Sequence, residues 1–404
     1  MKFNTYSISE LIDEIAMGPF GSNIKVECFV DDGIPVLNGS NLNGFFLTED
    51  SFRYVTEKKA DSLGRANAHR GDIVITHRGT LGQIVCIPET SKYDRYVISQ
   101  SQFRVKCNEK VLPEYLVYYF HTAIGQHKLL SNASQVGVPA LARASTTFQK
   151  IEVEIPDIKT QQKAVSVLNA IEAKINVNRS INENLQQQAQ ALFKSWFLNY
   201  EPWNGTAPNS WLHGKLGDYA NIKRGGSPRP IQEYLSDSGL RWLKISDVTG
   251  LQTPFIIDIK DHIIEEGLKK TVFLKAGSLV LSNSATPGVP KILDVDSCIH
   301  DGWLYFPESK FSNEYLYLYF KYIRQQLVNL SNGSVFNNLK TDILKGYPTI
   351  LPDEETLQRF DGIIKPMFLQ MQNLTRESHD LMDLRDTILP RLMSGELDVS
   401  GIKL

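Results

Sequence analysis

Residues 156–200 and 352–404 repeat apolar side chains at alternating intervals of three and four positions. This spacing places the apolar residues in one stripe along an α-helix and is the heptad pattern of a coiled coil. At 1.5 Å per residue, about 40 helical residues extend roughly 60 Å. The stripe residues that we expect to pair are Leu168, Ile171, Ile175, Leu185, Leu192, Ile364, Met367, Met371, Leu374, Leu381 and Ile388.

A lone helix of this kind would leave its stripe in water, so we expect the two helices to pair with each other. The chain between them is long enough to form a domain and return, which favours an antiparallel pair. Asn178 and Asn182 interrupt the first stripe and Ser378 interrupts the second. Polar residues in such stripes fix register, so we expect the two asparagines close to the level of Ser378. The alternative is that each helix packs only on its own domain.

Short apolar runs bounded by Gly, Pro, Asn and Asp precede each long helix and predict strands. In the first half they lie at residues 73–75, 83–87 and 103–105, and in the second half at 278–281 and 304–306. A helix is expected to begin near Glu114 and another near Glu314, and Asp157 and Asp353 are expected to cap the long helices.

The second half of the chain repeats the first. EYLVYYF at residues 114–120 returns as EYLYLYF at 314–320, and GDIVIT at 71–76 matches GSLVLS at 277–282. A period near 200 (314 − 114) is far longer than a solenoid repeat and indicates a duplicated domain. The prediction is an α+β fold with two similar mixed α/β domains, each followed by a long helix, the two helices forming an antiparallel coiled coil. The expected boundaries are 1–155, 156–200, 201–351 and 352–404.

Composition restricts the protein class more than the function. The 404 residues include four scattered cysteines without a C-x-x-C pair, which argues against structural zinc and a disulfide framework. The sequence shows neither a signal peptide nor an apolar run of membrane-spanning length, so we expect a cytoplasmic protein. A net charge of −2 and a pI of about 6.5 neither suggest nor exclude DNA binding.

No catalytic motif stands out. Phosphate-binding, dinucleotide-binding, zinc-protease and serine-hydrolase signatures are absent from the sequence. Asp157, Glu172 and Lys174 loosely resemble the residues of a metal-dependent nuclease, but a helix cap and a solvated helix face explain them better. The residues themselves therefore offer no convincing catalytic site and no metal site.

Polar, glycine-containing loops flank the predicted strands at matching places in both halves. Lys and Arg can neutralise phosphates, and Asn, Gln, Ser and Arg can read base edges, although any single loop of this composition is more often an ordinary turn. The candidate DNA-binding residues of the first half are Ser22, Asn23, Lys25, Asn38, Ser40, Asn41, Thr76, His77, Arg78, Thr80, Gln100, Gln102 and Arg143. Those of the second half are Lys223, Arg224, Ser227, Arg229, Lys244, Ser246, Asn283, Ser284, Thr286, His300, Asn332, Asn337 and Lys340.

Three motifs carry a resemblance to a known family. They are RGDIVI at 70–75, QQK at 161–163 in the opening of the first helix, and LPRLMSGEL at 389–397, with LFKSWF at 192–197 as the counterpart of the last. With the duplicated architecture, they make the whole chain resemble the specificity subunit of type I restriction-modification systems. The base-contacting residues vary between members of this family, so the candidate residues above come from their chemistry alone.

The resemblance implies a division of labour. In that family each variable domain reads one half of a bipartite double-stranded DNA target, and the paired helices act as a ruler and dock two modification (methyltransferase) subunits. Restriction (translocase/endonuclease) subunits join the complex. S-adenosylmethionine, ATP and Mg²⁺ are then expected on the partner subunits, with no cofactor bound by this chain. The resemblance therefore implies that this chain is not an enzyme. The alternative class is a coiled-coil scaffold with two ligand-binding domains and no DNA role.

Overall fold

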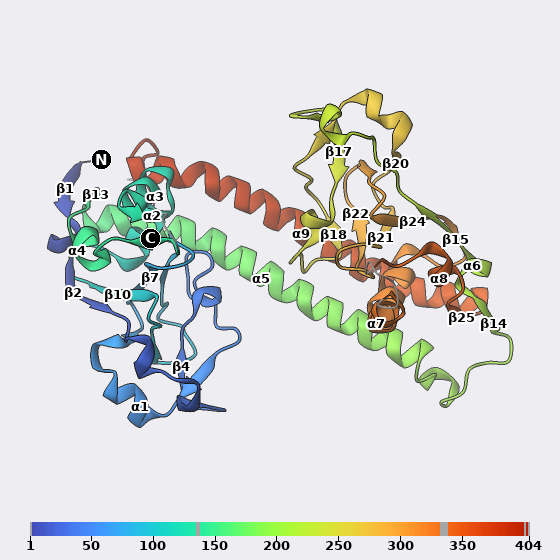
Figure 1. Ribbon diagram of the computed structural model, residues 1–404, viewed down its shortest axis with the longest axis horizontal. Coiled ribbons are helices and arrows are strands. Elements are labelled where there is room, and N and C mark those ends of the chain that lie inside the picture. Colours follow the sequence, from blue (N-terminus) through green and yellow to red (C-terminus); the bar gives the residue numbers. More distant parts are fainter. Residues whose placement is uncertain (1, 135–137, 332–337, 400, 403–404) are drawn as a thin grey trace. The chain divides into compact units, whose positions relative to one another are not determined.

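The computed structural model of the protein describes residues 2–134, 138–331, 338–399 and 401–402. The chain forms two compact units, one combining Met1–Ala173 with Met382–Leu404 (unit 1) and the other comprising Lys174–Leu381 (unit 2). Each unit therefore contains one mixed domain and a segment of both long helices, which can be followed by colour in Figure 1.

The described part of unit 1 contains three sheets and a short hairpin. In order across each sheet, the strands are β1 (Phe3–Ser7) and β13 (Glu152–Pro156); β2 (Ile12–Met17), β10 (Gln102–Cys107), β7 (Ile73–Thr76) and β8 (Ile84–Cys86); β3 (Phe29–Val30), β5 (Arg53–Val55), β4 (Ile34–Val36), β9 (Arg95–Val97) and β6 (Asn67–His69); and the hairpin β11 (Ala133–Ser134) and β12 (Ala140–Leu141). Every residue of β7 is buried, which explains its continuous apolar sequence. The predicted strands at 73–75, 83–87 and 103–105 are thus confirmed.

The described part of unit 2 is built in the same way. Its strands are β14 (Leu212–Lys215) and β25 (Pro348–Leu351); β15 (Ala220–Arg224), β24 (Trp303–Ser309), β21 (Leu279–Ser282), β22 (Pro290–Leu293) and β18 (Phe255–Ile256); and β16 (Leu235–Ser236), β19 (His262–Ile263), β17 (Leu240–Leu243), β23 (Ser297–Ile299) and β20 (Val272–Leu274). β21 is buried along its whole length, as β7 is in unit 1. The two strands predicted for this half are confirmed.

The two units share one topology. The order β2-β10-β7-β8 corresponds to β15-β24-β21-β22, and β3-β5-β4-β9-β6 corresponds to β16-β19-β17-β23-β20. In the latter pair of sheets, β4 and β9 of unit 1 are parallel and pair through Val36 and Val97. Their counterparts β17 and β23 of unit 2 are also parallel and pair through Trp242 and Cys298. This agreement in strand order and direction confirms the duplication inferred from the repeated sequence.

Shorter helices cover the sheets. They are α1 (Glu57–Ser62), α2 (Pro113–His121), α3 (Ala123–Leu130) and α4 (Ala144–Gln149) in unit 1, and α6 (Leu216–Tyr219), α7 (Asn313–Ser331) and α8 (Thr341–Lys345) in unit 2. Thr122 ends α2 and caps α3, because its Oγ1 accepts a 3.0 Å hydrogen bond from the backbone N–H of Gly125. The corresponding helix of unit 2, α7, continues without such a break. Both helices expected near Glu114 and Glu314 are present.

The long helices are α5 (Ile158–Phe197) and α9 (Glu354–Ser394). Asp157 Oδ1 accepts hydrogen bonds from the backbone N–H groups of Lys159 and Thr160, and Asp353 Oδ1 accepts one from Thr356, so both predicted caps are confirmed. None of the helices in the described ranges has the combination of length and apolar character needed to cross a membrane.

In unit 1 the start of α5 packs with the end of α9. Leu168 of α5 shares a core with Leu389 and Leu392 of α9 and with the aromatic residues of α2. The largely buried Arg385 and Glu172 side chains form an ion pair at 2.7 Å across the two helices. The last part of α9 is therefore a component of the first domain's core, which excludes the alternative that each helix packs only on its own domain.

In unit 2 the end of α5 packs with the start of α9. Phe193 and Phe197 of α5 enter one core with Phe360 and Phe368 of α9, and the Phe197 and Phe360 ring centroids are 4.7 Å apart. Because the end of one helix meets the start of the other in each unit, the helices run antiparallel. These four aromatic residues carry much of the contact, and the expected stripe did not include them.

A polar layer interrupts the helix pair in unit 2. Asn178 Nδ2 donates to Ser378 Oγ at 3.3 Å and to Glu377 Oε2 at 2.8 Å, and Asn182 Nδ2 donates to Thr375 Oγ1 at 3.2 Å. The expected proximity of Asn178 and Ser378 is confirmed, whereas Thr375 as the partner of Asn182 was not foreseen.

The stripe residues all have restricted exposure. Leu168, Ile171, Ile175, Ile364 and Met371 are buried, whereas Leu185, Leu192, Met367, Leu374, Leu381 and Ile388 are half-buried. α9 contains Pro366, which normally disrupts a helix interior because it lacks an N–H donor. The helix nevertheless continues, and the burial of Ile364, Phe368 and Met371 on either side of the proline stabilises it.

Candidate nucleic-acid interface

In both units, loops from the sheet that contains β2 or β15 meet loops from the sheet that contains β4 or β17. The loop after β2 begins with Gly18, whose N–H donates to the Gln102 carbonyl at 2.8 Å, and the loop after β15 begins with Gly225, whose N–H donates to the Trp303 carbonyl at 2.9 Å. A β-carbon on Gly18 would lie 1.9 Å from the Ser99 carbonyl oxygen, and one on Gly225 would lie 2.3 Å from that of His300. These glycines are therefore needed for close packing inside the protein, rather than for approach to a ligand.

In unit 1 these loops surround a recess of about 370 Å³, which we call recess 1. Its lining includes Phe20, Phe29, Val36, Asn38, Arg53 and Gln100. Phe20 has 83% of its surface exposed, and the Arg53 guanidinium lies 5.2 Å from the centre of the Phe29 ring. The recess thus presents aromatic surface and neutral amides beside one arginine.

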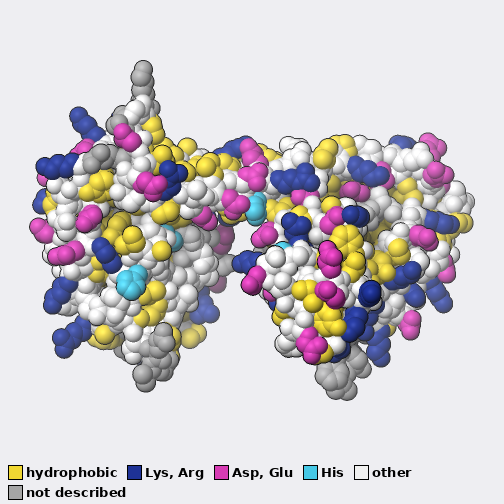
Figure 2. All heavy atoms as spheres, turned by 90° about the horizontal axis from the view of Figure 1, so that it is seen from above, with side chains coloured by type: hydrophobic (Ala, Val, Ile, Leu, Met, Phe, Trp, Pro, Cys, Tyr) yellow, Lys and Arg dark blue, Asp and Glu magenta, His cyan; other side chains and the backbone are white. Residues whose placement is uncertain are grey.

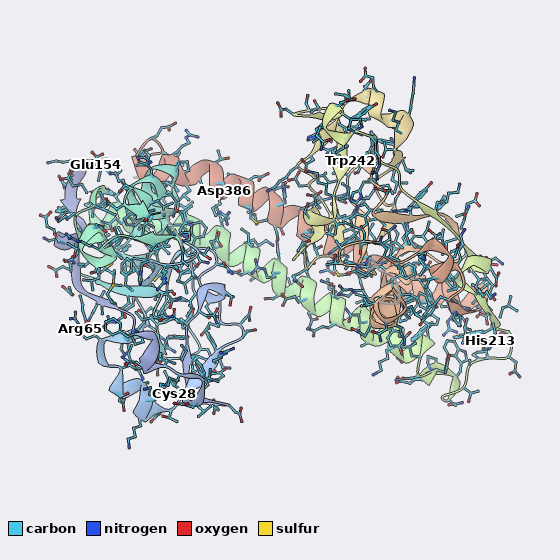
Figure 3. The ribbon with its side chains drawn as sticks, in the orientation of Figure 1. Cys28, Arg65, Glu154, His213, Trp242 and Asp386 are labelled. Atoms are coloured by element: carbon cyan, nitrogen blue, oxygen red, sulfur yellow. The ribbon has the colours of Figure 1, made fainter. Side chains whose placement is uncertain are left out.

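Unit 2 has a recess of about 630 Å³ at the corresponding place, which we call recess 2. Its lining includes Ser227, Pro228, Arg229, Trp242, Lys244 and His300. Figure 3 labels Trp242, which stands on β17. Because Val36 and Trp242 occupy equivalent parallel pairings, Asn38 of recess 1 is the counterpart of Lys244. Both also lie in the same type of turn, since Asn38 N–H donates to Asn41 Oδ1 and Lys244 N–H donates to Asp247 Oδ2.

Hydrogen bonds join the candidate loops of unit 1 into one surface. His77 Nε2 lies 3.1 Å from the Gln100 carbonyl oxygen, and Gly79 N–H donates to the Pro139 carbonyl at 2.9 Å. Burial lowers the pKa of His77, so the ring is neutral at neutral pH. Asn23, Lys25, Ser40, Arg78, Thr80, Gln100 and Arg143 are exposed, and Asn38 and His77 are half-buried. The side chain of Ser22 lies outside the described part of the structure.

Three candidates of unit 1 have internal roles instead. Asn41 is fully buried, and its Nδ2 donates to the carbonyl oxygens of Thr48 and Asp50. Thr76 Oγ1 donates to Gln83 Oε1 at 3.1 Å, and Gln102 Oε1 accepts from Ser99 N–H at 2.9 Å. Asn41, Thr76 and Gln102 therefore hold the loops in place and have almost no exposed surface to offer DNA.

The candidates of unit 2 divide similarly. Lys223, Arg224, Arg229, Ser246, Thr286 and Lys340 are exposed, and Ser227, Lys244, Ser284 and His300 are half-buried. Asn283 is buried, and its Nδ2 donates to the Asp301 carbonyl at 3.2 Å, so it also has an internal role. Asn332 and Asn337 lie outside the described residues.

The candidate residues chosen from the sequence did not include Asp301, which is central to this part of the structure. Ser227 Oγ donates to its Oδ1 at 2.7 Å, Arg229 Nη2 lies 3.2 Å from its Oδ2, and Arg224 Nη2 lies 3.6 Å from the same oxygen. Burial alone would raise the pKa of Asp301, but the Ser227 hydrogen bond and the two guanidinium groups lower it on balance. The carboxylate is therefore ionised and neutralises part of the basic loop at 223–229.

Surface charge is mixed elsewhere as well. Lys244 Nζ pairs with Asp261 at 2.7 Å, and Lys25 Nζ lies 3.7 Å from Glu27. On the face shown in Figure 2, basic and acidic side chains are interspersed and do not gather into a broad basic surface. Any nucleic-acid contact thus depends on local groups within the loops, as the near-zero net charge indicated.

The residues considered for metal-dependent cleavage have other partners. Asp157 caps α5, Glu172 pairs with Arg385 and Lys174 Nζ pairs with Glu377 at 3.1 Å. Within the described ranges, no group of three or more His, Cys, Asp or Glu side chains is arranged to hold a metal ion. Cap formation and ion pairing between the helices account for these three side chains.

Comparison with known proteins assigns the fold to a family. The family described as "Type I restriction modification DNA specificity domain" matches residues 19–187 and 208–371, one match in each repeat. The type I restriction enzyme MjaIX specificity subunit of Methanocaldococcus jannaschii is 23% identical and covers 97% of this chain and 93% of its own length. The HindI specificity subunit of Haemophilus influenzae is 23% identical, with 75% and 82% coverage.

A solved structure shares the fold. The crystal structure of a type I restriction-modification S subunit from M. genitalium matches with a TM-score of 0.62 at 14% identity, covering 97% of this chain and 96% of that one. The family match spans most of the sequence, and the duplicated topology with its paired helices agrees with it. The chain therefore belongs to the type I restriction modification DNA specificity family and is a specificity subunit, whose role is recognition of a DNA target.

Proposed function

We propose that the protein recognises a bipartite double-stranded DNA sequence, with one half-site read by each unit. The observation that carries this proposal is that equivalent loops surround recess 1 and recess 2 on the same strand framework but present different side chains. Shared loop positions favour the same mode of docking on a duplex. Different side chains at the tips favour different base sequences, because base edges are distinguished by donor and acceptor pattern.

The proposed contact set consists of the exposed and half-buried candidates. In unit 1 these are Asn23, Lys25, Asn38, Ser40, His77, Arg78, Thr80, Gln100 and Arg143; in unit 2 they are Lys223, Arg224, Ser227, Arg229, Lys244, Ser246, Ser284, Thr286, His300 and Lys340. Asn41, Thr76, Gln102 and Asn283 support the loops from inside. Phe20 joins the set, because a largely exposed aromatic side chain in a nucleic-acid interface can stack on bases or wedge between them.

The long helices are the proposed docking site for two modification subunits, with restriction subunits joining the complex. They carry exposed apolar side chains, including Val177, Ile363, Leu369 and Leu384, which are 42–57% exposed. Changing Leu369 to Glu should weaken assembly with the modification subunits, whereas changing its exposed neighbour Gln370 to Glu should not. Equal assembly of both variants would exclude Leu369 from the docking surface. S-adenosylmethionine, ATP and Mg²⁺ are assigned to the partner subunits.

The same helices are proposed to set the spacing between half-sites. Four residues would be inserted into each helix where the units divide, between Ala173 and Lys174 and between Leu381 and Met382. Each insertion adds about 6 Å, so the unread spacer should lengthen by one or two base pairs while both half-sites stay the same. Inserting two residues instead rotates the stripe by about 200° and should disrupt pairing. A fully active complex with an unchanged spacer would contradict the ruler.

The decisive test maps methylated positions across the genome of a host that expresses this chain with its modification subunits. Two defined half-sites separated by unspecified bases are expected, with matching protection of duplex DNA by the complex. One continuous site would contradict the bipartite proposal. If the chain were a protein scaffold, the complex would show no sequence preference and no steep loss of DNA affinity with rising salt.

A further inference from the structure

The basic loop of unit 2 is organised around one carboxylate. Arg224 is the last residue of β15, Arg229 lies five positions later, and Asp301 lies in the turn that precedes β24. Arg224 Nε donates to the Asp301 carbonyl at 2.5 Å, and the Arg229 and Arg224 guanidinium groups approach the same Asp301 Oδ2 at 3.2 and 3.6 Å. Two cations from one loop thus converge on a single acceptor residue.

Asp301 is itself held in place. Ser227 Oγ donates to Asp301 Oδ1 at 2.7 Å, Asp301 N–H donates back to Ser227 Oγ at 3.3 Å, and Asn283 Nδ2 donates to the Asp301 carbonyl. Asn283 is 4% exposed, so this support comes from the buried part of the unit. The carboxylate is consequently a fixed point to which the longer arginine side chains are tied.

This arrangement suits base edges better than phosphates. A cation that only neutralises phosphate gains nothing from a neighbouring carboxylate, which would repel the phosphate oxygens. An arginine that reads guanine must present two donors in a defined direction to O6 and N7, and anchoring one side of the guanidinium reduces the freedom lost on binding. Arg229 is 76% exposed, so most of its side chain remains available for such a contact.

We propose that Asp301 is a positioning residue that orients Arg229, with Arg224 beside it, to recognise a guanine in the half-site read by unit 2. The inference rests on the proposed bipartite function and adds the base and the residues responsible. Gln102 pairs with Thr76 in unit 1 as Trp303 pairs with Ser282 in unit 2, so the position equivalent to Asp301 is the neutral Gln100. The described part of unit 1 therefore has no such assembly at this position. An arginine oriented by this carboxylate is therefore expected for the unit 2 half-site only.

The experiment uses the full chain in complex with its modification subunits and a library of duplexes in which each position of the target is varied in turn. The wild-type complex should require one G·C pair in the unit 2 half-site. The Arg229→Lys variant keeps the positive charge but loses the bidentate guanidinium donor. Discrimination at that base pair should therefore fall roughly 5- to 150-fold. Affinity for non-specific DNA should stay close to that of the wild type.

The Asp301→Asn variant should relax the same base pair without lowering non-specific affinity, because a negative charge has been removed near the DNA. Asp296→Asn is the matched control: Asp296 is 38% exposed against 37% for Asp301, and it pairs with Lys275. The control should leave every position unchanged. Thermal unfolding of each complex reports whether the variants fold, and if Asp301→Asn does not, Arg229→Lys alone decides.

Several results would overturn the proposal. They are a unit 2 half-site without a required G·C pair, unchanged discrimination in either the Arg229→Lys or the folded Asp301→Asn complex, or an even loss at all positions. If Asp301 had only a structural role, its replacement would lower discrimination evenly at all positions. Failure of the proposed function looks different, because the wild-type complex would then show no two-part target at all.

Discussion

Recess 1 and recess 2 occupy equivalent places on the same strand framework, yet their chemistry differs. Recess 1 presents Phe20, Phe29 and the neutral side chains of Asn38 and Gln100. At the positions equivalent to those two amides, unit 2 has Lys244, which lines recess 2, and Asp301, which contacts the recess residues Ser227 and Arg229. Both Lys244 and Asp301 belong to ion pairs. Duplication has kept the backbone contacts and changed the groups that can meet DNA.

The retained contacts are those that shape the loops. Gly18 and Gly225 make the same backbone hydrogen bond to the neighbouring strand, and Asn41 and Asp247 accept the same backbone bond from the start of their turn. The altered side chains lie at the loop tips, where a change costs little folding energy. This separation of support from contact allows one framework to hold different recognition surfaces.

The largest expected effect comes from replacing a whole domain. Exchanging residues 1–155 for the equivalent domain of another specificity subunit should replace the unit 1 half-site completely and leave the other unchanged, as methylation mapping would show. The foreign domain must accept Leu389 and Leu392, because these residues of α9 lie in the unit 1 core. A matched exchange that also carries residues 382–404 controls for misfolding. A change in both half-sites would show that the recesses are not independent.

Next in size is the effect of filling the space beside the two glycines. Gly18→Ala and Gly225→Ala place a β-carbon against a backbone carbonyl oxygen, and overpacking of this kind typically costs about 1–3 kcal/mol. Each variant should lose discrimination in one half-site only, measured by binding to half-site libraries. Gly362→Ala in α9 is the control, since nothing lies within 4 Å of its added β-carbon. Loss in both half-sites from either change would contradict the separation of the units.

Much of this architecture was predictable because it depends on local periodicity. The apolar stripes and the buried runs predicted α5, α9, β7 and β21, and the sequence repeat predicted the shared topology. Pro366 would ordinarily argue against a continuous α9, and only the packing around it explains why the helix continues. The aromatic contacts of Phe193 and Phe360 likewise depend on how the helices meet the domain, which spacing alone does not specify.

The site was less predictable because its hydrogen bonds also depend on how distant segments of the chain meet. Residue type separated polar loops from strands. It could not distinguish the buried Asn41, whose side chain donates hydrogen bonds to backbone carbonyl groups, from its exposed neighbour Ser40. Asp301 lies 77 residues (301 − 224) from Arg224, so their pairing exists only once β15 and β24 lie side by side. The signal available in the sequence was an acidic residue in one loop and several basic residues in another loop expected to lie beside it.

A smaller effect is expected from Arg78, which is exposed in unit 1 where unit 2 has Ser284 at the equivalent position of the loop after β7 or β21. Arg78→Ser should weaken binding evenly across sequences, by about 1 kcal/mol, and make the slope of log affinity against log salt shallower by about 0.9, because one phosphate contact is lost. Binding titrations at several salt concentrations measure both quantities. Relaxed choice at a single base pair would instead assign Arg78 to base recognition, and an unchanged affinity would remove it from the interface.

The smallest effect on recognition, but a distinct one on stability, is expected from Lys291 in β22. It is 3% exposed, its Nζ donates to the carbonyl oxygens of Leu251 and Thr253, and the equivalent residue of unit 1 is the buried Val85. Burial, with a smaller contribution from the nearby Lys321, lowers the pKa of Lys291 to about 7 from 10.5. Between these values the unfolded chain holds one more proton than the folded one, so the stability of unit 2 should rise with pH, by at most about 1.4 kcal/mol per pH unit.

Lys291→Val gives unit 2 the residue of unit 1 and should remove this rise, although it leaves two carbonyl groups without their donor and lowers stability overall by about 1–3 kcal/mol. All five tryptophans of the chain lie between Trp196 and Trp303, within unit 2, so their fluorescence during urea unfolding reports on that unit. The wild type and the variant would be compared from pH 7.5 to 9.5. Parallel pH profiles would show that Lys291 keeps an ordinary pKa despite its burial, and that this difference between the two units has no consequence for stability.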